Sequence, residues 1–130
     1  MTPDGATMLD DCNILIVEDE FFIGLDLSLA LEDHGADVTG PFATVDTALP
    51  ACGPEVDAAI LDVDIHGGKS FPIADRLSER GVPFLFHTGR ADLDILTTRY
   101  GDDVPILVKP TQPRHVAVAI SRLLHADLND

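Results

Sequence analysis

Short apolar runs alternate five times with segments of helical length along this chain, and this rhythm constrains the fold more than any other feature of the sequence. The apolar runs cover 13–17, 37–40, 56–61, 82–87 and 104–108. The helical segments that follow them cover 20–34, 44–52, 72–80, 91–100 and 112–125. Short continuous apolar runs are typical of strands that are buried on both faces, as in parallel sheets. The sequence therefore predicts an α/β fold in which helices cover both faces of a parallel sheet.

These strand and helix units account for nearly the whole chain of 130 residues, of which 45% are hydrophobic. A chain of this length can bury one core without disulfides or a structural metal. We expect one domain over 11–126, with a flexible tail at 1–10 and a second tail at 127–130. The N-terminal residues lack the basic and apolar regions of a signal peptide, and no apolar run approaches the ~20 residues of a membrane span, so we expect a cytoplasmic protein.

The chain is strongly acidic, with a formal net charge of −15 and a pI near 4.3. This charge repels the phosphates of nucleic acids and the head groups of anionic lipids. We therefore expect binding to neither nucleic acid nor membranes, and instead partners that are proteins and cations. The two cysteines, Cys12 and Cys52, lie far apart in the sequence and are expected to be free thiols.

Polar side chains stand where four of the predicted strands end. Glu18 and Asp19 follow the first strand, Asp62 follows the third, Thr88 follows the fourth and Lys109 follows the fifth. In open parallel sheets, function gathers beyond the carboxyl ends of the strands. Three converging carboxylates repel one another unless a cation neutralises them, and hard oxygen ligands favour Mg²⁺. The sequence therefore predicts a magnesium site at this edge of the sheet.

The same residues fit phosphoryl transfer. Asp62 is the candidate nucleophile, while the Thr88 hydroxyl and the Lys109 ammonium would stabilise charge on the transferring phosphoryl oxygens. Each residue alone is a weak signal, but the set in this order is specific. The alternative for Asp19 and Glu20 is that the N-terminus of the following helix stabilises them without any metal.

From 12 to 124 the chain resembles the receiver domain of two-component response regulators. The matching motifs are Ile-Leu-Ile-Val-Glu-Asp-Glu at 14–20, Ile-Leu-Asp-Val-Asp at 60–64, His-Thr-Gly at 87–89 and Val-Lys-Pro at 108–110. The resemblance implies a flavodoxin-like (βα)5 three-layer sandwich with strand order 2-1-3-4-5. It also implies a cis peptide bond between Lys109 and Pro110.

By this resemblance, each residue at the strand ends has a role. Asp62 is the phosphoacceptor, and Thr88 and Lys109 contact the phosphoryl group. Mg²⁺ is held by Glu18, Asp19, Asp62 and the backbone carbonyl of Asp64. These implied roles agree with the chemistry that the residue types favour.

The segment 83–90 looks like the strand-four signature Pro-Phe-x-Phe-Ala-Thr-Gly-Tyr of a stand-alone receiver branch often served by HWE-type histidine kinases. His87 replaces the alanine and Arg90 replaces the tyrosine of that signature, so the match is partial. His87 could titrate near neutrality beside the phosphorylation site. A packing role is the simpler interpretation.

Other departures from the family concern the switch and the mouth of the site. Many receivers carry an aromatic residue three positions before the lysine, where it swings inward on phosphorylation, but this chain has Ile106 at that switch position. An isoleucine in a strand is stiff and is more simply a core residue. Asp64 and Arg90 stand where the family places side chains that modulate dephosphorylation. We hypothesise that they pair across the site, the alternative being two solvated surface charges.

The resulting functional prediction is a single-domain response regulator, not an enzyme in the usual sense. It would receive the phosphoryl group from a sensor histidine kinase or a phosphotransferase and signal to a downstream protein. Homodimerisation, which many receivers show, is left open. One rival is a pseudo-receiver that binds partners constitutively, which Ile106, His66 and Arg90 suggest. The other is a Mg²⁺-dependent phosphohydrolase in which Asp64 is the second acid, although the chain offers no cap segment.

Overall fold

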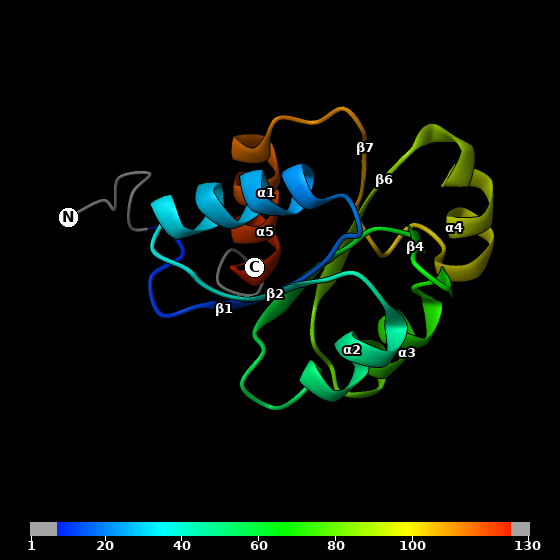
Figure 1. Ribbon diagram of the computed structural model, residues 1–130, viewed down its shortest axis with the longest axis horizontal. Helices are drawn as coiled ribbons and strands as arrows, with labels where there is room; N and C mark the ends of the chain where they lie inside the picture. Colours follow the sequence, from blue (N-terminus) through cyan, green and yellow to red (C-terminus); the bar gives the residue numbers. More distant parts are fainter. Residues whose placement is uncertain (1–7, 126–130) are drawn as a thin grey trace.

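The computed structural model describes residues 8–125, and its centre is a sheet of five parallel strands (Figure 1). The strands lie in the spatial order β2-β1-β3-β6-β7, which is the predicted order 2-1-3-4-5 once a small separate hairpin is left out. Their bounds are β1 (Asn13–Val17), β2 (Asp37–Phe42), β3 (Ala58–Leu61), β6 (Phe84–Thr88) and β7 (Ile106–Val108). The predicted flavodoxin-like fold is confirmed.

Helices cover both faces of this sheet, as the alternation of elements predicted. The α-helices are α1 (Phe21–Asp33), α2 (Val45–Ala48), α3 (Phe71–Glu79), α4 (Leu93–Tyr100) and α5 (Pro113–Leu124), and the 3-10 turns are η2 (Leu49–Ala51) and η3 (Arg90–Asp92). In Figure 1, α1 and α5 lie together on one side, with α2 and α3 on the other and α4 at the far edge. None of the helices within 8–125 is long and apolar enough to cross a bilayer.

The two faces of β1 show why the apolar runs are continuous. Ile14 and Ile16 belong to the core beneath α1 and α5, whereas Leu15 and Val17 belong to the core on the α3 side. All four side chains are fully buried. Since successive strand residues point to opposite faces, a strand covered on both sides needs apolar residues at every position. The same logic holds for β3, where Ile60 and Leu61 divide between the two cores.

The edge strand β2 runs further than the sequence indicated. A strand over 37–40 was expected to stop before Pro41, but the structure continues it to Phe42 through a cis Gly40–Pro41 bond. Gly40 has a φ of +106°, and a Cβ there would lie 2.6 Å from the carbonyl oxygen of Ile16. The pairing with β1 shifts register at this point. An edge strand accommodates a proline in this way because its outer side needs no partner.

The segment 62–68, predicted as a loop, contains a short antiparallel hairpin. Its strands are β4 (Asp64–Ile65) and β5 (Gly68–Lys69). Gly67 and Gly68 have φ values of +87° and +145°, which only glycine adopts readily. The other elements begin and end within a residue or two of the predicted positions.

The predicted tails lie largely outside the residues that the structure describes. Residues 1–7 of the expected tail, and the whole of 127–130, lie outside the described residues. Leu9, however, is fully buried in the core beneath α1 and α5, and its N–H donates to the carbonyl oxygen of His34 at 2.8 Å. Packing therefore begins before residue 11, because the turn ahead of β1 supplies an apolar side chain that closes the end of α1.

Candidate phosphorylation site

The candidate residues stand where the parallel strands end, and backbone hydrogen bonds fix them side by side. The N–H of Asp62 donates to the carbonyl oxygen of Val17 at 2.9 Å, which sets the end of β3 against the end of β1. The N–H of Lys109 donates to the carbonyl oxygen of Thr88 at 2.8 Å, which does the same for β7 and β6. The peptide bond between Lys109 and Pro110 is cis, as the resemblance implied. The strand ends thus bring the predicted residues together.

Lys109 bridges two of the three carboxylates. Its Nζ lies 2.8 Å from Oε1 of Glu18 and 2.8 Å from Oδ2 of Asp62. The Glu18 and Asp62 side chains are only 1% and 9% exposed, and that of Lys109 is 20% exposed. A buried carboxylate without a cation is costly. The lysine therefore compensates both acids at once.

The protonation of this cluster reflects burial and the ammonium together. Burial, together with the hydrogen bond and charge of Asp62, raises the pKa of Glu18 to about 7, although Lys109 opposes these effects. Burial alone would lower the pKa of Lys109, but its hydrogen bonds to Asp62 and Glu18 outweigh this and raise it. Lys109 is therefore charged at neutral pH, and Glu18 is the acid that exchanges a proton there.

The carboxylate of Asp62 has a fixed orientation. Oδ1 accepts a hydrogen bond from the N–H of Val63 at 2.8 Å, and it lies 3.1 Å from the hydroxyl of Thr88. Oδ2 faces Lys109. A carboxylate held on both oxygens is presented in one rotamer, which is the preorganisation that a nucleophile in phosphoryl transfer requires.

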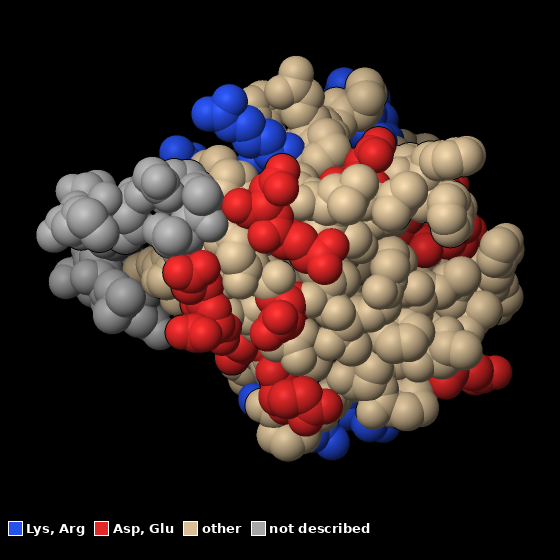
Figure 2. Space-filling view, turned by 60° about the vertical axis from the view of Figure 1, so that its left-hand side comes forward, with Lys and Arg blue, Asp and Glu red and all other residues tan. Residues whose placement is uncertain are grey.

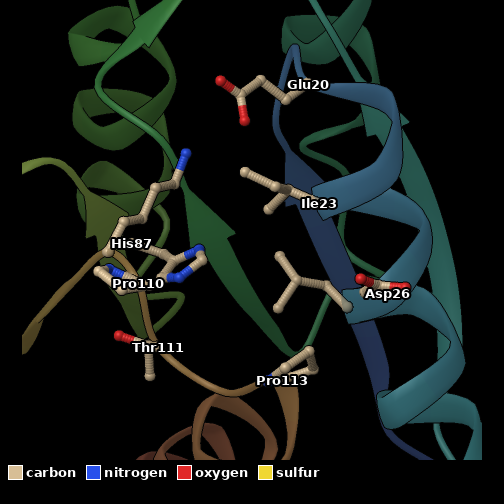
Figure 3. Close-up of a pocket in the computed structure, with 9 residues that line it drawn as sticks. Glu20, Ile23, Asp26, His87, Pro110, Thr111 and Pro113 are labelled. Atoms are coloured by element: carbon tan, nitrogen blue, oxygen red, sulfur yellow. The ribbon is translucent and has the colours of Figure 1, made fainter.

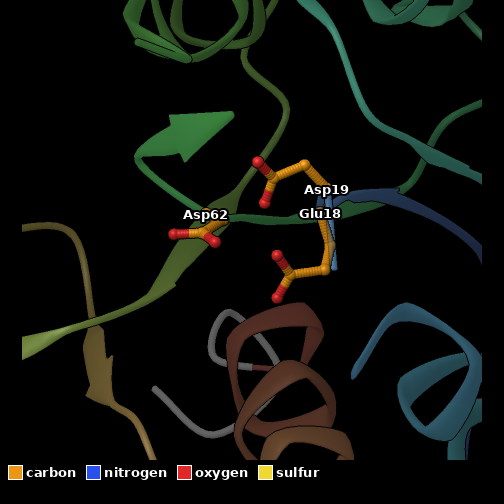
Figure 4. Close-up of side chains that lie close together, drawn as sticks. All are labelled: Glu18, Asp19 and Asp62. Carbon is orange, nitrogen blue, oxygen red and sulfur yellow. The ribbon is translucent and has the colours of Figure 1, made fainter. Parts of the chain in front are cut away.

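Three carboxylates converge at one point, as Figure 4 shows. One oxygen from each of Glu18, Asp19 and Asp62 lies within 4.8 Å of the others. Asp19 is partly exposed, whereas the other two are buried. Hard oxygen donors with one open side suit Mg²⁺, which keeps several of its waters. The residues present therefore fit the ion that the sequence predicted.

Asp64 and Arg90 do not form the predicted pair. Asp64 forms an ion pair with Lys69 instead, because the hairpin makes these two residues cross-strand partners. Arg90 is exposed in η3. The interpretation of a cross-site pair was wrong because the hairpin was not foreseen. The separate role of each residue in dephosphorylation stays a prediction, as does metal binding by the carbonyl of Asp64.

Asp92 was not among the residues predicted from the sequence. Its Oδ2 lies 2.9 Å from the hydroxyl of Thr88, closer than Oδ1 of Asp62 does. The only signal was an acid four residues after Thr88, at the start of the next helix. An acid in that position is usually explained by the helix dipole, so the pattern alone does not point to the site.

His87 is buried beside the site and lines a cavity of about 420 Å³ between α1 and the segment that follows β7. Figure 3 shows its ring facing Ile23 across this cavity, with Pro110 and Thr111 on its own side. Within 8–125, neither ring nitrogen has a hydrogen-bond partner. Burial and the charge of Lys109 together lower the pKa of His87 to about 4, although Asp62 acts in the opposite direction. This environment does not favour the titration near neutrality that the sequence suggested.

The switch position is occupied by an aliphatic side chain in a mainly aromatic environment. Ile106 is partly buried, packs against the α3-side core and pairs with Phe86 in the sheet. The ring of Tyr100, from α4, lies 5.2 Å from that of Phe86. The hydroxyl of Tyr100 donates to Asp75 of α3 at 3.1 Å, and Arg99 forms an ion pair with the same carboxylate. Tyr100 of α4 is thus held between Phe86 of β6 and Asp75 of α3.

Charge is distributed unevenly over the surface. Figure 2 shows one face on which acidic side chains gather, with Lys and Arg confined to its margins. Such a face carries a negative potential over a wide area. It agrees with the expectation that the protein does not approach phosphate backbones.

No family model matches this chain, and no curated protein matches it either. Solved structures do. SdrG from Sphingomonas melonis Fr1 is 43% identical, with a TM-score of 0.69 over 87% of this chain and 96% of SdrG. A response regulator receiver protein from Sinorhizobium medicae WSM419 is 26% identical, with a TM-score of 0.79 over 88% of this chain and 95% of that protein.

The receiver (REC) domain of the response regulator PhyR from Erythrobacter litoralis is 25% identical, with a TM-score of 0.75, and the match covers 88% of this chain and 91% of that domain. These similarities extend over nearly the whole chain. They also agree with the motifs at the strand ends, which were identified from the residues alone. This chain belongs to the family of response regulator receiver domains.

Proposed function

We propose that this receiver accepts a phosphoryl group on Asp62 and signals through protein contacts that depend on it. The observation that carries the proposal is the environment of the Asp62 carboxylate. An ammonium lies 2.8 Å from one of its oxygens and a hydroxyl lies 3.1 Å from the other. Two acids, Glu18 and Asp19, stand within 4.8 Å. In this proposal Asp62 is the nucleophile, and Lys109 and Thr88 are the two donors to the phosphoryl oxygens. Glu18 and Asp19 are the acids that bind the metal together with Asp62.

In the reaction, an oxygen of Asp62 attacks the phosphorus of a phosphohistidine on the donor protein. The new O–P bond forms as the P–N bond breaks, and the imidazole nitrogen leaves with the electron pair. Lys109 and Thr88 donate hydrogen bonds to the phosphoryl oxygens, whose charge grows as the donor leaves. Water must later attack the same phosphorus to return Asp62 to its free form.

Glu18, Asp19 and Asp62 are the side chains that would hold Mg²⁺, with the carbonyl of Asp64 as the further ligand that the resemblance implies. When bound, the ion supplies positive charge to the phosphoryl oxygens. The proton on Glu18 must leave before that carboxylate can act as a ligand, because its pKa is raised to about 7. Lys109 must also give up at least part of its contact with Glu18.

The donor partner is a sensor histidine kinase, for which the partial strand-four signature favours the HWE type, or a phosphotransferase. The downstream partner is a protein, since the charge of −15 disfavours nucleic acid. Action in the cytoplasm, where histidine kinases hold their phosphoryl groups, belongs to the same proposal.

A pseudo-receiver that binds constitutively is the alternative, and Ile106 remains its main support. The engagement of Asp62 by both Thr88 and Lys109 supports phosphorylation instead. A phosphohydrolase is less well supported, because the Asp64 carboxylate that it needs as an acid is paired with Lys69.

The test is the intact mass of the protein after incubation with acetyl phosphate, with and without Mg²⁺. We expect wild type to gain one phosphoryl group only with Mg²⁺, and Asp62→Asn to gain none. Asp46→Asn, which removes an exposed acid from α2, should behave as wild type does. No gain by wild type, with acetyl phosphate or with histidine kinases, would favour the pseudo-receiver.

A further inference from the structure

The hydroxyl of Thr88 has two acceptors for one hydrogen. Its Oγ1 lies 3.1 Å from Oδ1 of Asp62 and 2.9 Å from Oδ2 of Asp92. A hydroxyl donates a single hydrogen bond, and both neighbours are carboxylates that can only accept when ionised. Thr88 is fully buried, so its hydroxyl has no access to solvent as an alternative hydrogen-bond partner. The two acids therefore compete for this hydrogen.

The geometry points to Asp92 as a positioning residue that holds the Thr88 hydroxyl in the unphosphorylated protein and so opposes phosphorylation of Asp62. This inference rests on the proposed function, since it concerns the same site. Asp92 touches none of the reacting atoms and acts through Thr88. Its distance to the hydroxyl is the shorter of the two, so the contact that must be broken is well formed.

Phosphorylation would reverse the preference of the hydroxyl. A phosphoryl group on Asp62 adds negative charge and strong acceptor oxygens beside Thr88. The hydroxyl turns toward these oxygens, and Asp92 then loses its hydrogen-bond donor while it faces a new negative charge. Both effects drive the Asp92 carboxylate away from the site.

A second favourable environment for the Asp92 carboxylate lies at the N-terminus of α4. Asp92 is the last residue of η3 and directly precedes α4 (Leu93–Tyr100), yet its side chain makes no hydrogen bond to the backbone at the start of that helix. Negative charge at a helix N-terminus is stabilised by the helix dipole. Release of Asp92 therefore exchanges one favourable environment for another.

The experiment measures the affinity for beryllofluoride, a mimic of the phosphoryl group, in the presence of Mg²⁺ by ¹⁹F NMR. The variants are Asp92→Ala and Asp92→Asn, with Asp94→Asn as the matched control. Asp94 is an exposed acid in the first turn of α4, so its loss changes the net charge equally. The Asp92 variants, unlike the Asp94 control, also alter the hydrogen bond from Thr88.

We expect Asp92→Ala to bind beryllofluoride roughly threefold to tenfold more tightly than wild type, in keeping with the strength of charged hydrogen bonds. Asp92→Asn should show a smaller gain because its amide oxygen is a weaker acceptor. Asp94→Asn should stay within about twofold of wild type, since an exposed charge is screened. The rate of mass gain with acetyl phosphate should follow the same order.

Double variants at Thr88 and Asp92 show whether Asp92 acts through its hydrogen bond to Thr88 or only through charge repulsion. The gain from Asp92→Ala should persist with Thr88→Ser, which keeps the hydroxyl, and vanish with Thr88→Val, which lacks it. An equal gain in the Thr88→Val background, or no difference between Asp92→Ala and Asp94→Asn, would overturn the inference. Wild type that neither binds beryllofluoride nor gains mass would instead show that the proposed function itself is wrong, and the inference would fall with it.

Discussion

The two oxygens of the Asp62 carboxylate face two very different neighbourhoods. On the Oδ2 side, Lys109 is held by two buried acids, so its position is determined by charge on both sides. On the Oδ1 side, Thr88 shares its hydroxyl with Asp92, at the start of a helix near the surface. One side of the site therefore compensates charge, whereas the other can exchange one hydrogen-bond partner for another. Substitutions should therefore cost more stability on the first side than on the second, although both sides contribute donors to phosphorylation.

The largest expected effect is that of Lys109→Met. It leaves Glu18 and Asp62 buried without a cation, and we expect a loss of about 2 to 3 kcal/mol in the free energy of unfolding without Mg²⁺ at pH 7.5. The loss is limited because Glu18 can take up a proton. Urea unfolding with and without Mg²⁺ measures it, and the ion should restore part of the stability of the variant.

Lys69→Met is the matched control for that prediction. Lys69 pairs with Asp64 while 47% exposed, and exposed pairs contribute less than about 1 kcal/mol. Equal losses in the two lysine variants would show that the Lys109 side is no more than a surface interaction, and the contrast between the two sides would disappear.

A second effect concerns pH on the Lys109 side. The pKa of His87 falls from 6.5 to about 4 on folding, so the unfolded chain binds this proton first and stability is lost as the pH falls below 6.5. Between pH 7.5 and pH 5.5 the loss should be roughly 1 kcal/mol larger in wild type than in His87→Ala. Urea unfolding at the two pH values, without Mg²⁺, gives the difference.

Glu18 acts in the opposite direction over the same range. Its pKa is raised from 4.5 to about 7, so its contribution to stability is present at low pH and lost as the pH rises. This contribution occurs in wild type and in His87→Ala, and it largely cancels in the comparison. His115→Ala, which removes an exposed histidine of α5, should retain the wild-type pH dependence. A slope in His87→Ala that equals that of wild type would mean the buried ring is protonated in the folded state.

A smaller loss of stability is expected for Thr88→Val, on the other side of Asp62. Valine keeps the shape of threonine and removes the shared hydrogen bond, so unfolding should become easier by only about 1 kcal/mol. The rate of mass gain with acetyl phosphate should nevertheless fall about tenfold, because a donor to the phosphoryl group is lost. A variant that loses stability like Lys109→Met but keeps its phosphorylation rate would reverse the assignment of the two sides.

The smallest effect is that of Tyr100→Phe, at the far end of α4. It removes the hydroxyl that donates to Asp75, in a half-buried position, while the aromatic packing stays, so we expect a loss of about 0.5 kcal/mol. Hydrogen exchange should show faster opening at the end of α4, with little change near Asp92. Faster exchange at both ends would mean that α4 moves as one body and is not anchored at Tyr100.

The sequence was sufficient for the fold and for most of the site, for one physical reason. Asp62 and Lys109 each follow a continuous apolar run, and a parallel sheet brings the carboxyl ends of such runs to one edge. The contacts that escaped prediction depend on local backbone geometry. Asp64 pairs with Lys69 because a hairpin places them opposite each other, and Asp92 reaches Thr88 through a 3-10 turn.

Leu9 escaped for a related reason. A single leucine among acids and turn residues shows no period, so only the folded chain reveals that it fills the end of a core. The bridging position of Lys109 was also not foreseen in full. The resemblance indicated a lysine that contacts a phosphoryl group, whereas its contact with Glu18 depends on how the two side chains share the space between the strands.

Because Lys109 bridges Glu18 and Asp62, its ammonium serves as the counterion of both acids in the free protein. A divalent cation that approaches Glu18 and Asp62 must displace an ammonium, so a titration with Mg²⁺ measures an exchange of cations and not the filling of a vacancy. The apparent Kd then includes the work of moving Lys109. A phosphoryl group that attracts Lys109 would already have drawn it away from Glu18, so this cost would no longer reduce the affinity for the ion. The ion and the phosphoryl donor should therefore each strengthen the binding of the other.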